Sequence, residues 1–142
     1  MAARQSKPLL EPENVHPALA SLNDEQREAA MVIDHPTLVV APAGTGKTAV
    51  LAGRYRYMLA EGLTPVNILA ITFSNKAAGE MRERVGDALK GYDERDIWIM
   101  TFHALGKRIL ESNPEPFGLT ERLRVADEQE SHHIMRECIR NV

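Results

Sequence analysis

The stretch TLVVAPAGTGKT at residues 37–48 decides the fold class. Its first five residues are mostly apolar and β-branched, which predicts a buried strand at residues 37–41. Gly44 and Gly46 predict a tight loop after that strand, and the apolar spacing beyond Lys47 predicts a helix. A strand, a glycine loop and a helix in this order are typical of a phosphate-binding loop.

The residue types of this loop suit a nucleotide triphosphate. Backbone amides around Gly44 and Gly46 can surround phosphate oxygens, and the N-terminus of the following helix adds partial positive charge. Lys47 can reach the β- and γ-phosphates, and Thr48 can place its hydroxyl on Mg²⁺. A glycine-rich turn without a ligand is the alternative. The residues predicted to bind ATP and Mg²⁺ are Ala41, Pro42, Ala43, Gly44, Thr45, Gly46, Lys47, Thr48 and Ala49.

Further apolar runs and amphipathic patterns follow the loop. Residues 67–73 and 96–101 predict two more buried strands, and the helices between the strands are expected to end near Gly62 and Gly91. Because only a helix-length connection returns the chain to the same end of a sheet, this order predicts a parallel sheet. The expected fold class is α/β, with an incomplete P-loop parallel sheet core and a helical C-terminal extension.

The segments on either side of this core are less regular. Residues 1–21 contain three prolines and are expected to form a loosely attached, flexible arm. Asn23 and Gln26 have the spacing of a capping box, which predicts a helix that ends at Pro36. Beyond the third strand the pattern is mainly helical, and Asp127 is expected to cap the last helix.

Composition and charge exclude several classes of protein. Cys138 is the only cysteine, so the chain forms no internal disulfide and no thiolate zinc site, and a reducing cytoplasm is the expected location. No apolar run approaches the roughly 20 residues of a membrane helix. The formal net charge is −3, but residues 47–108 hold 10 Lys and Arg against 7 Asp and Glu. This local excess of positive charge is compatible with DNA binding, although a solvated surface of mixed charge explains it more simply.

Four segments resemble, in order and spacing, the superfamily 1A helicases of the UvrD/Rep/PcrA family. LNDEQREA at residues 22–29 is similar to the family's Q motif, and the phosphate loop follows it. ITFSNKAAGEM at residues 71–81 resembles motif Ia, and TFHALGKRIL at residues 101–110 resembles motif Ib. Motif Ia is the most family-specific string in the chain. The resemblance extends over about residues 22–142.

The resemblance implies a domain organisation and a role for single residues. Residues 22–110 would form the first part of a RecA-like subdomain, and residues 111–142 would begin a helical insertion. Gln26 would read the adenine edge, because its amide offers a donor and an acceptor. Without the resemblance, a role of Gln26 in helix capping alone is equally well supported. Ala41 is common in this family. Ala49 replaces an arginine that many members carry, so one nucleotide contact is expected to be missing.

Motifs Ia and Ib lie on single-stranded DNA in this family. Phe73 would stack a base, and Ser74 and Asn75 would donate to a phosphate. Without the resemblance, Phe73 could belong to the core and Ser74 could simply cap a helix, and His103 would more often be a structural hydrogen-bonding residue. The residues implied to contact DNA are Thr72, Phe73, Ser74, Asn75, Lys76, Thr101 and His103.

The family resemblance implies ATP-driven 3′ to 5′ movement on single-stranded DNA, with the missing remainder of the helicase and its second RecA-like domain as partner. Hydrolysis in the family needs acidic residues that follow a buried strand; the acidic stretch after Ala126 mimics them but is expected to be a helix cap. We therefore expect nucleotide binding without efficient hydrolysis. The alternatives are a stand-alone, non-catalytic module that binds nucleotide or DNA, and a small-molecule P-loop kinase, which predicts no DNA binding.

Overall fold

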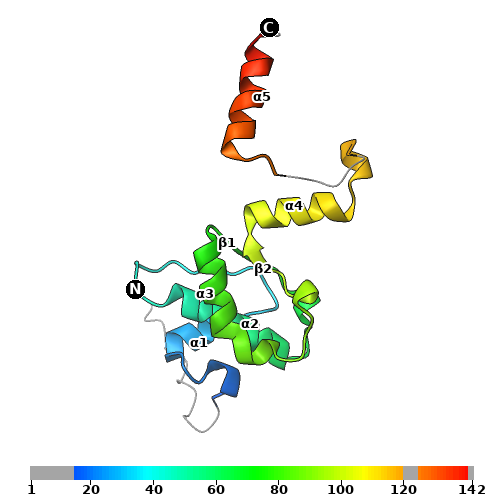
Figure 1. The fold of residues 1–142 in the computed structure, drawn as a ribbon. Helices are drawn as coiled ribbons and strands as arrows, with labels where there is room; N and C mark the ends of the chain where they lie inside the picture. The colour runs from blue at the N-terminus through cyan, green and yellow to red at the C-terminus, as the bar shows by residue number, and fades with distance from the viewer. Residues whose placement is uncertain (1–14, 120–124, 141–142) are drawn as a thin grey trace. The chain divides into compact units, whose positions relative to one another are not determined.

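The computed structural model describes residues 15–119 and 125–140. The chain divides into two compact units, Met1–Thr101 and Phe102–Val142. The described residues of the first unit form the phosphate loop, three α-helices and a small sheet (Figure 1). Those of the second unit form two further α-helices.

Two short parallel strands form the sheet of the first unit. β1, Ala70–Thr72, pairs with β2, Ile99–Thr101, so that Thr72 lies opposite Thr101. Each strand lies within one of the apolar runs that predicted it, and a 3₁₀ turn precedes each strand. The second and third predicted strands are therefore confirmed in shortened form, and their parallel pairing is as expected.

The prediction of a first strand at residues 37–41 is wrong. This segment has no regular structure, and Leu38 and Val40 are 87% and 85% exposed. A strand needs a neighbour for its backbone N–H and C=O groups. Within the described residues, however, β1 and β2 pair only with each other. The β-branched residues thus favour an extended backbone, but no sheet neighbour orders it.

Helix α1, Asp24–Met31, begins at the capping box that the sequence predicts. Asn23 Oδ1 accepts a hydrogen bond from the Gln26 backbone N–H at 2.9 Å, and Gln26 Oε1 accepts one from the Asn23 N–H at 3.1 Å. The helix ends at Met31, earlier than the predicted end at Pro36. Val32 is already extended, and the β-branched pair Val32 and Ile33 loses side-chain freedom in a helix.

The core of the first unit lies between helices and sheet. α3, Asn75–Val85, packs against both strands and against α2, Lys47–Ala60, while α1 packs against α2 (Figure 1). The main apolar cluster consists of Ala52, Tyr55, Ile68, Met81, Val85, Ile97 and Ile99. A second cluster consists of Leu19, Leu22, Ala30 and Val50. Helix α2 contributes to both clusters, so the helix that follows the phosphate loop is fixed from two sides.

Part of the expected arm is packed. A 3₁₀ turn at Pro17–Leu19 buries Leu19, which belongs to the cluster between α1 and α2. Leu22 lies so close to Gly53 of α2 that a Cβ at this glycine would be 2.6 Å from Leu22 Cδ1. The close approach ties the segment before α1 to α2. The rest of the expected arm, residues 1–14, lies outside the described residues.

The second unit contains α4, Phe102–Ser112, and α5, Glu128–Arg140. Asp127 caps α5: its Oδ1 accepts from the Glu130 N–H at 2.8 Å, and its own N–H donates to Glu130 Oε2 at 3.1 Å. This reciprocal pair confirms the helix-cap interpretation of Asp127. The acidic stretch that mimics a catalytic motif therefore has a structural role in starting α5.

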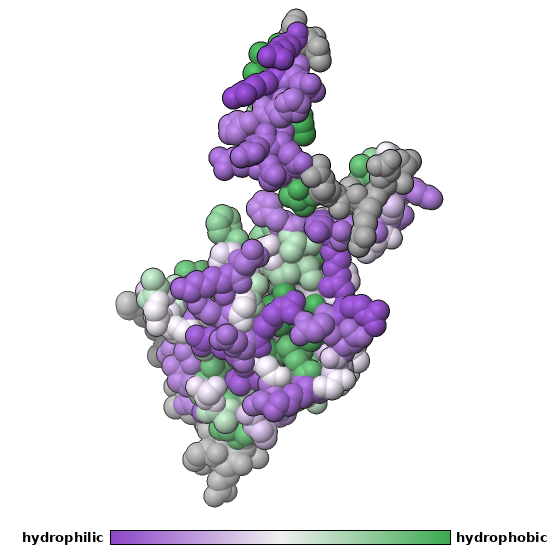
Figure 2. Space-filling model, in the orientation of Figure 1, coloured by the Kyte–Doolittle hydropathy of each residue, from purple (hydrophilic) through white to green (hydrophobic). Residues whose placement is uncertain are grey.

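Helix α5 carries both polar and exposed apolar side chains. The visible face of the helix is mostly hydrophilic, with hydrophobic side chains at its margins (Figure 2). Ile134, Met135 and Ile139 are all exposed. In residues 15–119 and 125–140, no helix combines the length and the apolar character needed to cross a membrane.

Candidate functional site

A hollow of about 530 Å³ lies beside the phosphate loop. Its walls come from α1, the segment before the loop, the loop itself and the start of α2. Ligand pockets usually measure roughly 300–1,000 Å³, so this volume suits a nucleotide-sized molecule. The residues that line the hollow are Asn23, Glu25, Gln26, Ala29, Val39, Val40, Ala41, Pro42, Thr45, Lys47 and Val50. The structure therefore places Gln26 of the Q motif at the same hollow as the loop.

The backbone of the loop leaves the start of α2 open to an anion. Gly44 and Gly46 have φ angles of 80° and 90°, a region that favours glycine. Gly46 is the N-cap of α2 and, lacking a side chain, makes no capping hydrogen bond. The first amides of a helix without a side-chain cap need another acceptor, and phosphate oxygens are well suited to that role.

Lys47 lies across the loop. Its Nζ donates hydrogen bonds to the carbonyl oxygens of Ala41 at 2.7 Å and Pro42 at 2.6 Å. Thr45 Oγ1 also donates to the Pro42 carbonyl, at 2.8 Å. Carbonyl oxygens carry no formal charge, and an ionised acceptor makes a stronger bond with an ammonium group. A phosphate at the loop would therefore compete well for Lys47.

Thr48 lies in the first turn of α2 and is exposed, as are Ala43 and Gly44, while Ala49 is half-buried. The Thr48 hydroxyl is the protein ligand that the sequence predicts for Mg²⁺. Across the described part of the chain, no three His, Cys, Asp or Glu side chains gather to hold a metal.

Gln26 makes a contact that its sequence position does not reveal. Besides completing the capping box, its Nε2 donates to the carbonyl oxygen of Thr45 at 3.1 Å. The two residues are 19 positions apart in the chain. A helix cap and the phosphate loop are thus joined by one side chain.

A second group of predicted residues lies where β1 ends and α3 begins. Phe73 is 92% exposed, so the core interpretation of this residue is wrong. Ser74 caps α3 by accepting the Ala77 N–H at 3.2 Å, as the capping interpretation predicts. Asn75 and Lys76 occupy the first turn of α3 and are exposed. Residues 73–76 are therefore all exposed, and together they present an aromatic ring, a hydroxyl, an amide and an ammonium group to solvent.

The remaining residues predicted to contact DNA differ in exposure. Thr72 ends β1, is half-buried and donates from Oγ1 to the Ser74 carbonyl at 3.1 Å. Thr101 ends β2 beside it, and its side chain is buried. His103 is exposed in the first turn of α4, within the second unit. The sheet pairing thus brings Thr72 and Thr101 together.

Comparison with known proteins places these features in a family. Residues 22–142 match the UvrD/REP helicase N-terminal domain. The chain belongs to the UvrD/REP helicase family. The matched region includes the Q-motif segment, the phosphate loop and both segments that resemble DNA-contacting motifs.

Similar members of the UvrD/REP family are ATP-dependent DNA helicases named PcrA. The chain is 41% identical over 122 residues to PcrA of Leuconostoc citreum, 42% over 123 residues to that of Bacillus subtilis strain 168, and 40% over 124 residues to that of Staphylococcus aureus strain Mu50. These matches cover 85%, 86% and 87% of this chain. The chain spans only 16% to 17% of the length of these relatives.

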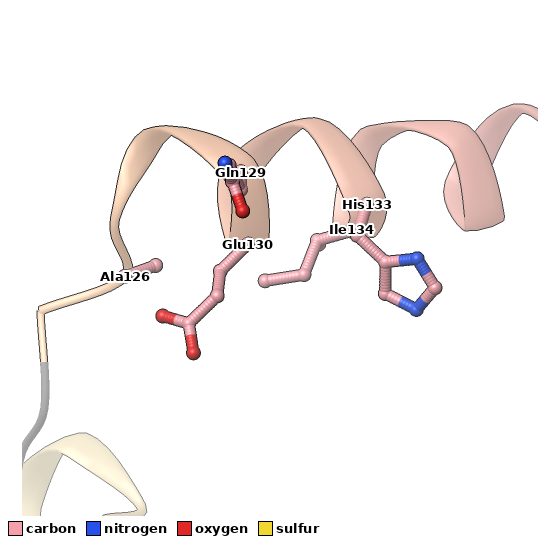
Figure 3. Close-up of a pocket in the computed structure, with 5 residues that line it drawn as sticks. All are labelled: Ala126, Gln129, Glu130, His133 and Ile134. Carbon is pink, nitrogen blue, oxygen red and sulfur yellow. The ribbon is translucent and has the colours of Figure 1, made fainter.

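A second hollow of about 530 Å³ lies along α5 of this UvrD/REP family member. Figure 3 shows its lining residues, all of which come from α5 or the residue segment leading into it: Ala126, Gln129, Glu130, His133 and Ile134. Glu130 is already engaged in the capping box of α5. Because its lining residues come from one helical segment, this hollow lacks the converging groups of a binding site. The hollow at the phosphate loop is the better candidate.

Proposed function

We propose that this chain is the part of a UvrD/PcrA-like DNA helicase that binds Mg-ATP through residues 41–49 and contacts single-stranded DNA through residues 72–76. The observation that carries the proposal is the convergence at one hollow of Lys47, the uncapped start of α2 and Gln26. These groups supply a mobile cation, open amides and a hydrogen-bonding amide. The RecA-like character of the fold and the 3′ to 5′ direction rest on the family resemblance.

Mg²⁺, when bound with the nucleotide, would neutralise phosphate charge, and Thr48 is the residue that would hold it. The chain's own contribution is positioning: Gly44 and Gly46 shape the loop, and Lys47 balances charge on the outer phosphates. Family membership and the PcrA relatives support this assignment. The exposed side chain of Phe73 supports the DNA surface, because a base can stack only on an accessible ring.

We expect this chain to bind Mg-ATP with negligible turnover. Phosphoryl transfer depends on an acid that orients water and on further cations around the phosphates, and the acidic pair at Asp127 and Glu130 is engaged in capping α5. Steady-state phosphate release, measured with and without single-stranded DNA, tests this expectation. Robust DNA-stimulated turnover that Lys47→Ala abolishes would contradict it.

Replacing Phe73 by alanine is expected to weaken single-stranded DNA binding by about tenfold, since stacking one base on an aromatic ring contributes roughly 1–3 kcal/mol. The affinity can be measured by fluorescence anisotropy with a labelled oligothymidine over a series of salt concentrations. Tyr92→Ala is the matched control, because Tyr92 is another exposed aromatic residue of the first unit.

The same titration includes His103→Ala. If His103 donates to a phosphate, its loss lowers the affinity without abolishing the salt dependence that phosphate contacts produce. Equal, salt-insensitive binding by wild type and by both variants would count against the proposed DNA contacts. Binding of nucleotide without any DNA binding would instead favour a different P-loop protein class, such as a small-molecule kinase.

A further inference from the structure

We propose that Gln26 is a positioning residue of the phosphate loop and acts on any bound triphosphate, whatever its base. The inference rests on the proposed triphosphate site and adds a second role to the adenine contact that the family resemblance implies. The Gln26 side chain bridges two backbone groups that are far apart in the sequence, the Asn23 N–H and the Thr45 carbonyl. It therefore connects α1 to the loop before any base is bound.

The capping box fixes the direction of the Gln26 side chain. Gln26 occupies the third position of α1, where its Oε1 accepts the Asn23 N–H at 3.1 Å and its own N–H donates to Asn23 Oδ1 at 2.9 Å. With the oxygen held in this way, the Nε2 end of the amide is directed to Thr45, whose carbonyl lies at 3.1 Å. The start of α1 thus determines where the amide meets the loop.

The Thr45 carbonyl belongs to the same peptide unit as the Gly46 N–H. Because a trans peptide is planar, its C=O and N–H point in opposite directions, and fixing one fixes the other. By holding the Thr45 carbonyl, Gln26 therefore sets the direction of the Gly46 amide, which is one of the amides proposed to bind phosphate. The effect on the loop requires no contact between Gln26 and the nucleotide.

The absence of a side chain at Gly46 permits this contact. A Cβ at Gly46 would lie 2.6 Å from Gln26 Nε2, so α1 and the loop approach each other closely only with glycine at this position. Two separate features therefore require glycine at position 46, the positive φ of its backbone and the nearness of the Gln26 side chain.

The positioning role and an adenine contact can coexist. A glutamine amide has two N–H donors and two acceptor lone pairs, and the two backbone bonds use one of each. A residue that only reads adenine would affect ATP binding alone. A residue that positions the loop would also affect ligands that have no base.

Two variants separate the roles of Gln26. Gln26→Met keeps a similar side-chain size without charge and removes the side-chain bonds to both Asn23 and Thr45. Ala30→Gly weakens α1 without a change of charge and leaves Gln26 in place, and Ala30 does not line the hollow, so this variant controls for loss of α1 stability. Calorimetric titration of the full 142-residue chain with Mg-ATP and with Mg-tripolyphosphate then compares a ligand with adenine and one without.

We expect Gln26→Met to weaken the binding of both ligands by about fivefold or more, the effect of one net hydrogen bond, and Ala30→Gly to leave the tripolyphosphate affinity nearly unchanged. Weakening of ATP binding alone by Gln26→Met would overturn the positioning role. Equal losses of tripolyphosphate affinity in both variants would also overturn it, because loss of α1 stability would then explain the result.

A measurement without ligand separates failure of this inference from failure of the proposed function. Amide NMR spectra of the ligand-free chain should show altered Gly46 and Lys47 resonances in Gln26→Met and smaller changes there in Ala30→Gly. If wild type binds neither ligand, the proposed nucleotide site fails, yet these spectra still decide whether Gln26 holds the loop. Unchanged Gly46 and Lys47 resonances in Gln26→Met would contradict that role.

Discussion

Replacing Lys47 by alanine is expected to weaken Mg-ATP binding by about a hundredfold, because charge-assisted hydrogen bonds contribute roughly 1.5–3 kcal/mol each. In the structure the Lys47 ammonium reaches across the loop to the carbonyls of Ala41 and Pro42, which places it beside the hollow. Calorimetric titration with Mg-ATP measures the effect. Lys47 is exposed, so the free energy of unfolding should change little.

The matched control is Lys90→Ala. Lys90 is an exposed lysine of the first unit that forms an ion pair with Asp87 at 2.8 Å, away from the residues that line the hollow. It removes the same charge from the chain without touching the proposed site, so Mg-ATP affinity should stay near that of wild type. Equal affinities of wild type and Lys47→Ala would remove Lys47 from the proposed site.

Gly46→Ala is expected to reduce both nucleotide affinity and stability. A side chain at φ 90° is strained, and its Cβ would collide with Gln26 Nε2 at 2.6 Å. A left-handed backbone alone costs an L-residue roughly 1–2 kcal/mol. We therefore expect the free energy of unfolding in urea to fall by about 2 kcal/mol, and Mg-ATP affinity to fall at least about tenfold, because the loop must shift to relieve the collision.

Gly79→Ala is a control that is expected to change the free energy of unfolding in the opposite direction. Gly79 lies inside α3, and a Cβ there would meet nothing within 4 Å. Alanine at such a helix position is expected to raise the free energy of unfolding by about 0.5–1 kcal/mol. Similar destabilisation by the two substitutions would show that the backbone and contacts of Gly46 have no special importance.

Local features of the chain were predictable from sequence because their partners lie nearby in the chain. The helix caps at Asn23 and Asp127 each join residues three positions apart, and both form as expected. The helix after the loop and the cap of α3 at Ser74 are likewise determined by short spacings. Such contacts need little tertiary information.

Features that depend on distant partners were predicted less well. The apolar run at residues 37–41 has strong strand preference, yet a strand also requires a hydrogen-bonded neighbour, and none forms among the described residues. The contact between Gln26 and Thr45 arises from the packing of α1 against α2 and has no sequence signature. Residue type alone also left a core position open for Phe73, whereas the family resemblance implied the exposed ring that the structure has.

The central claim is that the loop around Lys47 binds the phosphates of ATP, and an amide NMR titration of the chain with Mg-ATP tests it most directly. We predict saturable shifts of the Gly44, Gly46, Lys47 and Thr48 amides, while the amides of α5 stay unchanged. Loop amides that do not move at saturating Mg-ATP, or shifts confined to α5, would contradict the account.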